Sequence, residues 1–455
     1  MSPLVPPRIV PPAKPLAGLR FARTFLRNPL EVVPQVAYEE DFVPFGGTRS
    51  PRVWITSPAL VKAVLLDQRD KFCKRTQIRL LGPLLGSGIL TSEGAEWKWQ
   101  RQAAAPVFRP ESLETFVPAF VRAAEARLAE WRRSADGTPQ RIDIEMTRAT
   151  FDVIAATLLP SSDAKLPADV QKSVAMLAEA GGWDLLFASL NLPTWVPHPG
   201  RASSARAMMT LRSRVAAVVR ERRAAAHEPA ADLTRRLIDA RDPETSQAMS
   251  DERLVDNVLT FYLAGHETTA KALTWTLYLL ARSREWSDVV ADEVERVVGR
   301  EPVTAARVEK LVLTQQVVKE AMRLYPPVPI MSRQALADVE LEGHAIRART
   351  SMLIPIYAVH RHERRWSEPH AFRPERFSPE NEAAIPRYQY MPFGAGPRVC
   401  IGRAFAMLEA TAMLATFIRD ASFEPVEGAE PVPVARVTLL PRDGLPLKVR
   451  WRRLV

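Results

Sequence analysis

The chain has 455 residues, 47% hydrophobic and 25% charged, which is typical of a globular protein with one large or two ordinary domains. Its two cysteines exclude a disulfide framework and a cysteine-rich zinc or iron–sulfur site, and they favour a reducing compartment. The net charge of +10 is spread along the chain without a nucleic-acid motif, so we expect no nucleic-acid partner, but a solvated surface with, at most, a basic patch for an acidic electron donor.

The N-terminal stretch is rich in proline, and we expect residues 1–42 to form an extended arm followed by a first helix. It has no long apolar run, so we expect neither a signal peptide nor a membrane anchor, and hence a cytoplasmic protein with no membrane span. A hairpin is predicted for 43–45 and 52–55, joined by a loop that contains two glycines. A helix over 58–66 follows, with Ser57 as its N-cap and proline in its first turn.

Helical patterns dominate the middle of the chain. Helices are predicted over 111–165, 202–239, 251–282, 308–325 and 401–419. Between 326 and 400, prolines, aromatic residues and short β-type runs are more frequent. At the end of the chain, 437–440 and 447–449 are predicted to form a hairpin that turns at Asp443-Gly444. We therefore expect a mainly α protein with small β-sheets at its edges, and the lack of a repeat or a proline-rich linker predicts one domain over 43–455.

The most informative stretch is 393–402, Phe-Gly-Ala-Gly-Pro-Arg-Val-Cys-Ile-Gly. Cys400 stands in a glycine-rich loop, with an arginine two residues before it and an amphipathic run directly after it. Such a loop presents one thiolate, with several backbone N–H groups aimed at it, to a soft metal whose other ligands would have to come from a macrocycle. The alternative is a structural cysteine that is buried before a helix, since free cysteine is often buried.

The pattern F-x-x-G-x-R-x-C-x-G resembles the haem-binding loop of the cytochromes P450, in which the cysteine is the axial ligand of the haem iron. The resemblance implies the cytochrome P450 fold, a single haem-enclosing domain, with haem (heme b, iron protoporphyrin IX) as its cofactor. It assigns Cys400 as the metal ligand. It also places Phe393, Gly394, Arg398 and Gly402 in the cofactor-binding loop.

A second motif, Ala-Gly-His-Glu-Thr-Thr at 264–269, lies inside the long apolar helix predicted over 251–282. Polar groups in so apolar a helix must be hydrogen-bonded or they cost stability. The motif resembles the oxygen-binding groove of the P450 family. By that resemblance Glu267 and Thr268 are the catalytic pair that delivers protons, while Ala264 and Gly265 border the haem. The alternative is a threonine that hydrogen-bonds to the carbonyls of its own helix.

A third motif is Glu-x-x-Arg at Glu320 and Arg323, whose spacing places both side chains on one face of a helix. Alone, such a pair is more often a surface ion pair. The downstream sequence Pro-Glu-Arg-Phe contains Arg376 and resembles the segment that locks this pair in the P450 family. The resemblance implies a buried structural triad of Glu320, Arg323 and Arg376, which would fix the cysteine loop.

The two propionates of a haem need cationic or polar partners, and arginine binds carboxylates in a bidentate manner. Trp97, Arg101, Arg333 and Arg398 match positions of the family that serve this purpose. Each arginine alone would be interpreted as a solvated surface residue. Lys271, on the same helical stripe as Ala264, is expected to extend to the haem edge or to solvent, or else to contact an anionic substrate.

Two histidines, His360 and His362, stand where the family often has His-Arg-Asp-Pro before a tryptophan. They could hold a surface metal ion, although a lone pair rarely does. Trp366 and Pro369 of that segment are retained, and we expect the loop to be structural.

By resemblance, the chain is a haem-thiolate monooxygenase that inserts one oxygen atom of O2 into a lipophilic small molecule. Electrons would come from a separate ferredoxin or flavodoxin-type donor with its NAD(P)H reductase, docked on the Cys400 side of a monomer. The segments expected to line the substrate pocket are mostly apolar, and they are 77–90, 183–190, the helix near Phe261 and Ala264, 330–331 and 437–438. The alternatives are a peroxygenase or a non-oxidative isomerase, and a haem sensor or a helical protein with an inert cysteine.

Overall fold

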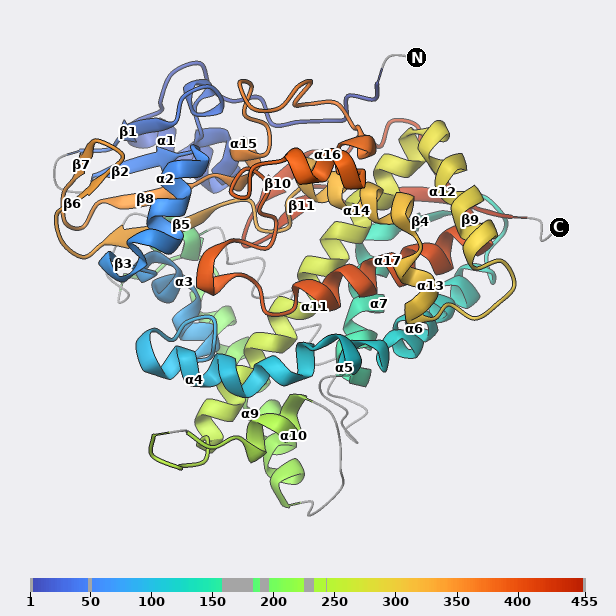
Figure 1. Cartoon of the computed structure of the whole chain (residues 1–455), viewed down its shortest axis with the longest axis horizontal. Helices are drawn as coiled ribbons and strands as arrows, with labels where there is room; N and C mark the ends of the chain where they lie inside the picture. Colours follow the sequence, from blue (N-terminus) through green and yellow to red (C-terminus); the bar gives the residue numbers. More distant parts are fainter. Residues whose placement is uncertain are drawn as a thin grey trace. The chain divides into compact units, whose positions relative to one another are not determined.

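The computed structural model describes residues 3–47, 51–157, 183–188, 196–224, 233–242 and 244–452, and it is mainly helical (Figure 1). The longer helices are α1 (Gly18–Arg27), α3 (Arg75–Leu85), α4 (Gly94–Ala104), α6 (Val117–Trp131), α7 (Ile142–Thr157), α9 (Arg201–Ala224), α11 (Asp251–Arg282), α12 (Arg284–Val297), α14 (Val312–Leu324) and α17 (Arg403–Asp420). The shorter ones are α2 (Pro58–Lys62), α5 (Pro110–Glu114), α10 (Leu233–Asp239), α13 (Ala305–Glu309), α15 (Ile356–Val359) and α16 (Pro379–Ala384). In the described ranges, no helix is long and apolar enough to cross a membrane.

Twelve short strands complete the described part of the chain. They are β1 (Phe42–Phe45), β2 (Arg52–Ile55), β3 (Phe72–Cys73), β4 (Pro139–Arg141), β5 (Met331–Ala335), β6 (Val339–Leu341), β7 (His344–Ile346), β8 (Ser351–Ile354), β9 (Ala421–Pro425), β10 (Pro433–Ala435), β11 (Leu439–Pro441) and β12 (Pro446–Trp451). Three stretches of the predicted elements, 158–165, 189–190 and 225–232, lie outside the described residues. The expected class, mainly α with small sheets, is confirmed.

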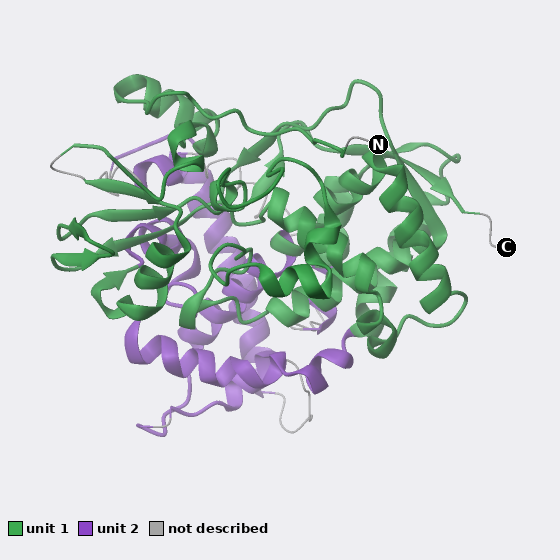
Figure 2. Cartoon of the chain, turned by 45° about the horizontal axis from the view of Figure 1, so that its top comes forward, with its two compact units in different colours: residues 1–73, 117–150, 268–455 green, residues 74–116, 151–267 purple. Residues whose placement is uncertain are grey.

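The chain divides into two compact units, each assembled from separate segments (Figure 2). Unit 1 comprises Met1–Cys73, Val117–Thr150 and Thr268–Val455, and unit 2 comprises Lys74–Phe116 and Phe151–Glu267. Two of the boundaries fall inside helices α7 and α11. These two helices therefore contribute residues to both units, and neither unit is a separate domain of the sequence.

Unit 1 contains a five-stranded sheet in the order β1-β2-β8-β5-β3. The predicted hairpin is present, since β1 pairs antiparallel with β2. The hydroxyl of Ser57 accepts a hydrogen bond from the N–H of Ala59, which confirms the predicted N-cap of α2. Apolar side chains of the sheet and of α2 form one buried cluster that includes Val53, Ile55 and Ile354.

The helical part of unit 1 is organised around α17, which packs against α6, α12, α13 and α14. Its side chains from Glu409 to Ile418 are buried without interruption, as expected for a helix enclosed on all sides. Aromatic pairs reinforce the contact with α6, because Trp131 stacks on Phe417 and Phe120 meets Phe405 edge-on. The cysteine loop thus leads into a helix that starts exposed at Arg403 and is enclosed from Glu409 onward.

The N-terminal arm is an extended part of unit 1, and hydrogen bonds join its backbone to two tyrosine side chains. The carbonyl of Pro7 accepts from the hydroxyl of Tyr325, and the hydroxyl of Tyr357 accepts from the N–H of Ile9. These contacts give the arm a fixed course without secondary structure of its own.

The predicted C-terminal hairpin is wrong. A turn does form at Asp443-Gly444, where Gly444 has a φ of +83°. However, β11 pairs with β10, and β12 pairs with β4 and β9. Pro441 and Pro446 flank the turn, and because proline has no N–H, neither can donate the hydrogen bonds of a hairpin ladder there.

Two predicted helices are interrupted. The stretch 111–165 contains strand β4 between α6 and α7, and 308–325 consists of α13 and α14. The second break has a clear cause, since the carboxylate of Glu293 in α12 accepts hydrogen bonds from the N–H groups of Leu313 and Thr314 at 2.8 Å. A side chain from another helix thereby satisfies the first free N–H groups of α14.

Candidate functional site

The cysteine loop is held in a tight conformation by its own backbone. The N–H of Cys400 donates to the carbonyl of Phe393 at 2.9 Å, and the N–H of Gly394 donates to that of Met391 at 3.0 Å. Gly394 and Gly396 both have a φ of +71°, which is the left-handed region that favours glycine. Cys400 is an exposed residue, which does not agree with the alternative of a buried structural cysteine.

Gly396 is required by a close contact with a distant part of the chain. A Cβ atom there would lie 2.3 Å from the backbone oxygen of Leu65, whereas one at Gly394 would meet only the flexible side chain of Met331, at 3.4 Å. Replacing Gly396 with alanine is expected to lower the free energy of unfolding by about 1–3 kcal/mol and to reduce the fraction of protein that carries haem. Gly394→Ala is the control for the positive φ alone, and an equal loss in both variants, measured by thermal unfolding, would contradict the contact with Leu65.

Helix α17 begins at Arg403, three residues after the cysteine, with Gly402 in the N-cap position. The N-terminus of an 18-residue helix carries a partial positive charge. Because Cys400 lies directly before it, this end of α17 favours a negative charge on the sulfur. Of the two cysteines, both within the described residues, Cys400 is the exposed one, and it lies where a thiolate is stabilised.

The motif at 264–269 lies in the middle of α11. Ala264 is exposed and Thr268 partly buried, and their spacing of four residues puts them on one stripe of the helix. The turns before and after this stripe, represented by Phe261 and Ala270, are buried. The stripe is therefore an accessible strip of a largely enclosed helix, with the partly buried Glu267 at its side.

The other faces of the motif are occupied by packing. His266 is buried, with its Nδ1 2.6 Å from the carbonyl oxygen of Tyr262 and its ring edge-on to Phe151. A Cβ atom on Gly265 would lie 2.8 Å from the Cδ1 atom of Ile154 in α7, so the glycine allows the close approach of this helix. The packing of α7 against α11 therefore requires a glycine at position 265, in addition to its expected place beside a cofactor.

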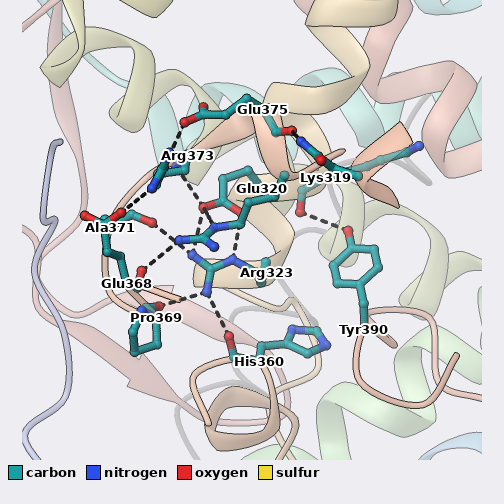
Figure 3. A network of polar contacts seen from close by, with 12 residues as sticks. Lys319, Glu320, Arg323, His360, Glu368, Pro369, Ala371, Arg373, Glu375 and Tyr390 are labelled. Carbon is teal, nitrogen blue, oxygen red and sulfur yellow. Dashed lines mark hydrogen bonds and ion pairs between the residues drawn. The ribbon is translucent and has the colours of Figure 1, made fainter. Parts of the chain in front are cut away.

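Glu320 and Arg323 form a fully buried ion pair in α14 (Figure 3). The guanidinium holds the carboxylate in a bidentate manner, with Nε to Oε2 at 2.6 Å and Nη2 to Oε1 at 2.7 Å. Its remaining N–H groups donate to the backbone carbonyls of His360, Pro369 and Ala371 at 2.8 to 3.0 Å. All five donors of the guanidinium are thereby used.

Arg376 lies next to this pair but is held less tightly. Its Nε is 3.6 Å from Oε1 of Glu320, and its Nη2 donates to the carbonyl of Glu368 at 2.8 Å. Its side chain is 12% exposed, against 0% for Glu320 and Arg323. The structure therefore brings the three predicted residues together, with Arg323 as the centre of the network.

His360 connects this network to the cysteine loop, a contact that was not predicted from the sequence. Its carbonyl accepts from Arg323, and its ring Nε2 accepts from the N–H of Met391 at 2.9 Å. Burial, together with Arg323, lowers the pKa of His360 to about 3, so the neutral ring can act as an acceptor. Because Met391 in turn binds Gly394, the ion pair is linked through His360 to the loop that carries the thiol.

The residues predicted to hold carboxylates are partly buried, and none is a fully solvated surface residue. In unit 2, Trp97 and Arg101 lie on α4, with the guanidinium carbon of Arg101 5.8 Å from the centre of the indole. In unit 1, Arg333 lies on β5 and donates to the carbonyl of Ser332 at 2.8 Å, and Arg398 ends the short 3-10 turn Gly396–Arg398. One thiol with cationic and indole N–H donors is the donor set that a haem with two propionates requires.

Two further expectations can be compared with the structure. Lys271 does not extend into solvent, since it is 9% exposed and its Nζ lies 3.5 Å from the hydroxyl of Thr147. The pair His360 and His362 is buried, and burial lowers the pKa of His362 to about 4. Across the described ranges, no group of three or more His, Cys, Asp or Glu side chains is arranged to hold a metal ion.

Part of the segment 77–90, which is expected to line the substrate pocket, is hydrogen-bonded to α11 within unit 2. The carboxylate of Asp256 accepts from the N–H of Ser87 at 2.8 Å and from Arg212 at 2.7 Å, while Asn257 accepts from the N–H of Ile89 at 2.9 Å. The sequence predicted this segment as a pocket loop without indicating what holds it. Its position is set by two neighbouring polar residues of α11.

Comparisons with known proteins agree with the motifs. The family model described as Cytochrome P450 matches residues 11–449. Cyclooctatin synthase of Streptomyces melanosporofaciens is 30% identical over 434 residues, covering 95% of this chain and 93% of that protein. Cytokinin hydroxylase of Arabidopsis thaliana is 31% identical and covers 91% of this chain and 81% of that protein.

The same result comes from a solved structure. The crystal structure of the cytochrome P450DA heme domain superposes with a TM-score of 0.83 and 26% identity, and the match covers 98% of this chain and 99% of that one. The family match extends over the cysteine loop, the α11 motif and the Glu-x-x-Arg pair. The chain therefore belongs to the cytochrome P450 family, and haem b is its cofactor.

Proposed function

We propose that this P450 is a monooxygenase that inserts one oxygen atom of O2 into a lipophilic small molecule, with electrons from a separate protein. The observation that carries the proposal is the exposed Cys400 in a loop closed by backbone hydrogen bonds, directly before the N-terminus of α17. When bound, a thiolate-ligated haem supplies the activation of dioxygen and the transfer of its oxygen atom. The chain's own residues bind the haem, orient the substrate and deliver protons.

Cys400 would hold the iron, while Phe393, Gly394 and Gly402 shape the loop around the sulfur. The propionates would be bound by the guanidinium groups of Arg101, Arg333 and Arg398 and by the indole N–H of Trp97, because these donors match a carboxylate in charge and geometry. Ala264 leaves one face of α11 free of a large side chain. These assignments rest on the family motifs and on the partial exposure of the side chains.

Thr268 and Glu267 are the proposed proton-delivery pair. A threonine hydroxyl both donates and accepts a hydrogen bond, so Thr268 can hold a water molecule and pass a proton to it. The neighbouring carboxylate of Glu267 can replace that proton. Their partial burial on the accessible strip of α11 supports this role.

Replacing Thr268 with alanine is expected to uncouple the enzyme. Product formed per NAD(P)H consumed should fall roughly 100-fold, the low end of what a positioned proton donor contributes, while NAD(P)H and O2 are still consumed. The control is Thr276→Ala, because the hydroxyl of Thr276 is buried and donates to the carbonyl of Ala272 in its own helix. Well-coupled turnover in Thr268→Ala would refute the assignment.

The electron donor is proposed to be an acidic ferredoxin or flavodoxin. The net charge of +10 and the exposed Arg403 directly after the cysteine loop support an electrostatic encounter. The rate of haem reduction by such a donor should therefore fall as ionic strength rises. If peroxide supports turnover but neither a ferredoxin nor a flavodoxin does, the enzyme is a peroxygenase instead. Substrates can be identified by screening lipophilic compounds for those that shift the spin state of the haem.

A further inference from the structure

A hollow of about 660 Å³ lies in unit 1, between residues 364–376 and the end of α16. Its volume is within the range of small-molecule sites, roughly 300–1,000 Å³. None of its described lining residues is assigned to haem or to proton delivery. We call it the arginine hollow, because its charged lining residues are one glutamate, Glu375, and four arginines, Arg364, Arg365, Arg373 and Arg376.

Two of the arginines are each held by an acid of the N-terminal segment. Nη2 of Arg364 donates to Oε1 of Glu40 at 2.6 Å, and Nη2 of Arg365 donates to Oδ1 of Asp41. Neither acid lines the hollow. Within the described residues, the Nη1 atoms of both guanidinium groups make no hydrogen bond, and that of Arg365 is buried. A buried cationic donor without a partner is costly, which favours a ligand that accepts from it.

The other two arginines lie beside the ion pair that supports the cysteine loop. Arg373 uses its Nη1 and Nε atoms to bind Glu368 and Glu375 (Figure 3). Nη2 of Arg376 donates to the carbonyl of Glu368 at 2.8 Å, and its Nε lies 3.6 Å from Oε1 of Glu320. Nη2 of Arg373 and Nη1 of Arg376 therefore keep their donors without a hydrogen bond in the described part of the chain.

These contacts orient the guanidinium groups and leave positive charge in the hollow. Most of the acids hold the arginines from positions that do not line it, so little side-chain freedom is lost when a ligand binds. Burial lowers the pKa of Arg376, and the charges of Arg323 and Arg373 add to this effect, although Glu320 opposes it. An anion in the hollow would offset the repulsion between these cations.

We propose that the arginine hollow binds an oxyanion, namely the phosphate group of a small molecule. Guanidinium groups bind phosphate in a bidentate manner, and four Nη groups match a ligand with three or more acceptor oxygens and a charge of about −1.5 to −2. The apolar side chains of Pro58, Ile385 and Pro386 also line the hollow and would contact the rest of a phosphate ester. The proposal goes beyond the monooxygenase function and does not depend on it.

Calorimetric titration of the holoenzyme at constant ionic strength tests the site directly. Inorganic phosphate should bind saturably, and phenyl phosphate should bind more tightly if the natural ligand is an ester rather than free phosphate. Arg364→Gln and Arg373→Gln should each raise the Kd at least about tenfold, the effect of losing a hydrogen bond to a charged group. If the wild type shows no saturable binding of either probe, the proposal is wrong.

The matched control is Arg450→Gln. Arg450 is paired with two acids, Glu424 at 3.2 Å and Asp136 at 3.5 Å, and it does not line the hollow. Its loss removes the same charge and the same kind of ion pair, so binding should be unchanged. An equal weakening in Arg450→Gln and Arg373→Gln would show that phosphate responds only to the net charge of the protein.

A second pair of variants leaves all four arginines in place, in case an arginine variant fails to fold. Ala384 is exposed and lines the hollow as the last residue of α16. Ala384→Glu and Ala384→Gln introduce side chains of equal size that differ in charge. Phosphate binding should be at least about tenfold weaker in Ala384→Glu than in Ala384→Gln. Equal affinities would contradict an anion site.

Thermal unfolding supplies a further readout that requires no turnover. A ligand that binds only the folded protein raises the unfolding temperature, and the rise should follow the calorimetric Kd and be reduced in Arg364→Gln. A rise that continues with concentration and is equal in all variants is the general effect of a stabilising salt, and it would overturn the proposal. So would slower haem reduction by a ferredoxin in Arg364→Gln without any phosphate binding, since the arginines would then be a docking surface.

Discussion

Replacing Cys400 with serine is expected to abolish the thiolate spectrum and oxygen insertion together. The reduced, CO-bound protein should lose the red-shifted band of thiolate ligation, and NAD(P)H-driven product should fall below detection. A serine hydroxyl is a hard, weakly acidic ligand, and it does not supply the electron density that a thiolate gives to haem iron. The loop itself should be unchanged, because serine is close to cysteine in size and the hydrogen bond from residue 400 to Phe393 is made by the backbone.

The chain offers a matched control in its second cysteine. Cys73 lies on β3, where its strand pairs with β5, and it is partly buried. Cys73→Ser should therefore keep the wild-type spectrum and activity. A thiolate band that survives in Cys400→Ser would contradict the assignment of the metal ligand, whereas its loss in Cys73→Ser would show that the loop is not the haem site.

Short-range patterns predicted the parts of this fold that depend on neighbouring residues. Ser57 caps α2 through a residue two positions away, and the first hairpin pairs strands that are close in sequence. The bounds of α11, Asp251–Arg282, also agree with the predicted range, because one long run of helical periodicity determines them.

The wrong and incomplete predictions involve partners far away in the chain. The break before α14 depends on Glu293, about twenty residues upstream on another helix, and β12 pairs with β4, which is some three hundred residues earlier. The two prolines beside the Asp443-Gly444 turn were visible in the sequence and could have ruled out the hairpin. Nothing in a single sequence, by contrast, indicates that β12 pairs with β4 and β9 instead of with β11.

The candidate site shows the same division. The motifs located Cys400, Glu320 and Arg323 because their spacing is local. The link that His360 makes to the cysteine loop follows from burial and from a contact that only the fold creates. A lone histidine in the sequence gives no sign that its ring is neutral.

Replacing Arg323 with lysine is expected to abolish the recovery of folded, haem-containing protein, although the positive charge is conserved. Arginine makes five hydrogen bonds here, two to Glu320 and three to backbone carbonyls, and its guanidinium lies 5.1 Å from the ring of Trp366. An ammonium group has three donors and cannot match this planar arrangement. Breaking a buried ion pair costs about 3–5 kcal/mol, which is a large part of the stability of an ordinary protein.

The loss should appear first at the cysteine loop. The carbonyl of His360 would lose its donor, and the ring of His360 holds Met391 at the start of that loop. Haem content, measured from the reduced CO-bound spectrum, should therefore fall below detection in Arg323→Lys and in Glu320→Gln, and thermal unfolding of any remaining protein should occur at a lower temperature. Arg376→Lys should have a smaller effect, since Arg376 lies 3.6 Å from the carboxylate and is partly exposed.

A control on the same helix separates this effect from the loss of any ion pair. Lys319 of α14 pairs with Glu382 near the surface, where both side chains are partly exposed. Glu382→Gln should change the free energy of unfolding by no more than about 1 kcal/mol, because solvent screens such a pair. If Arg323→Lys were as mild as Glu382→Gln, the buried pair would not hold the cysteine loop, and the loop would have to be fixed by its glycines and its contact with Leu65 alone.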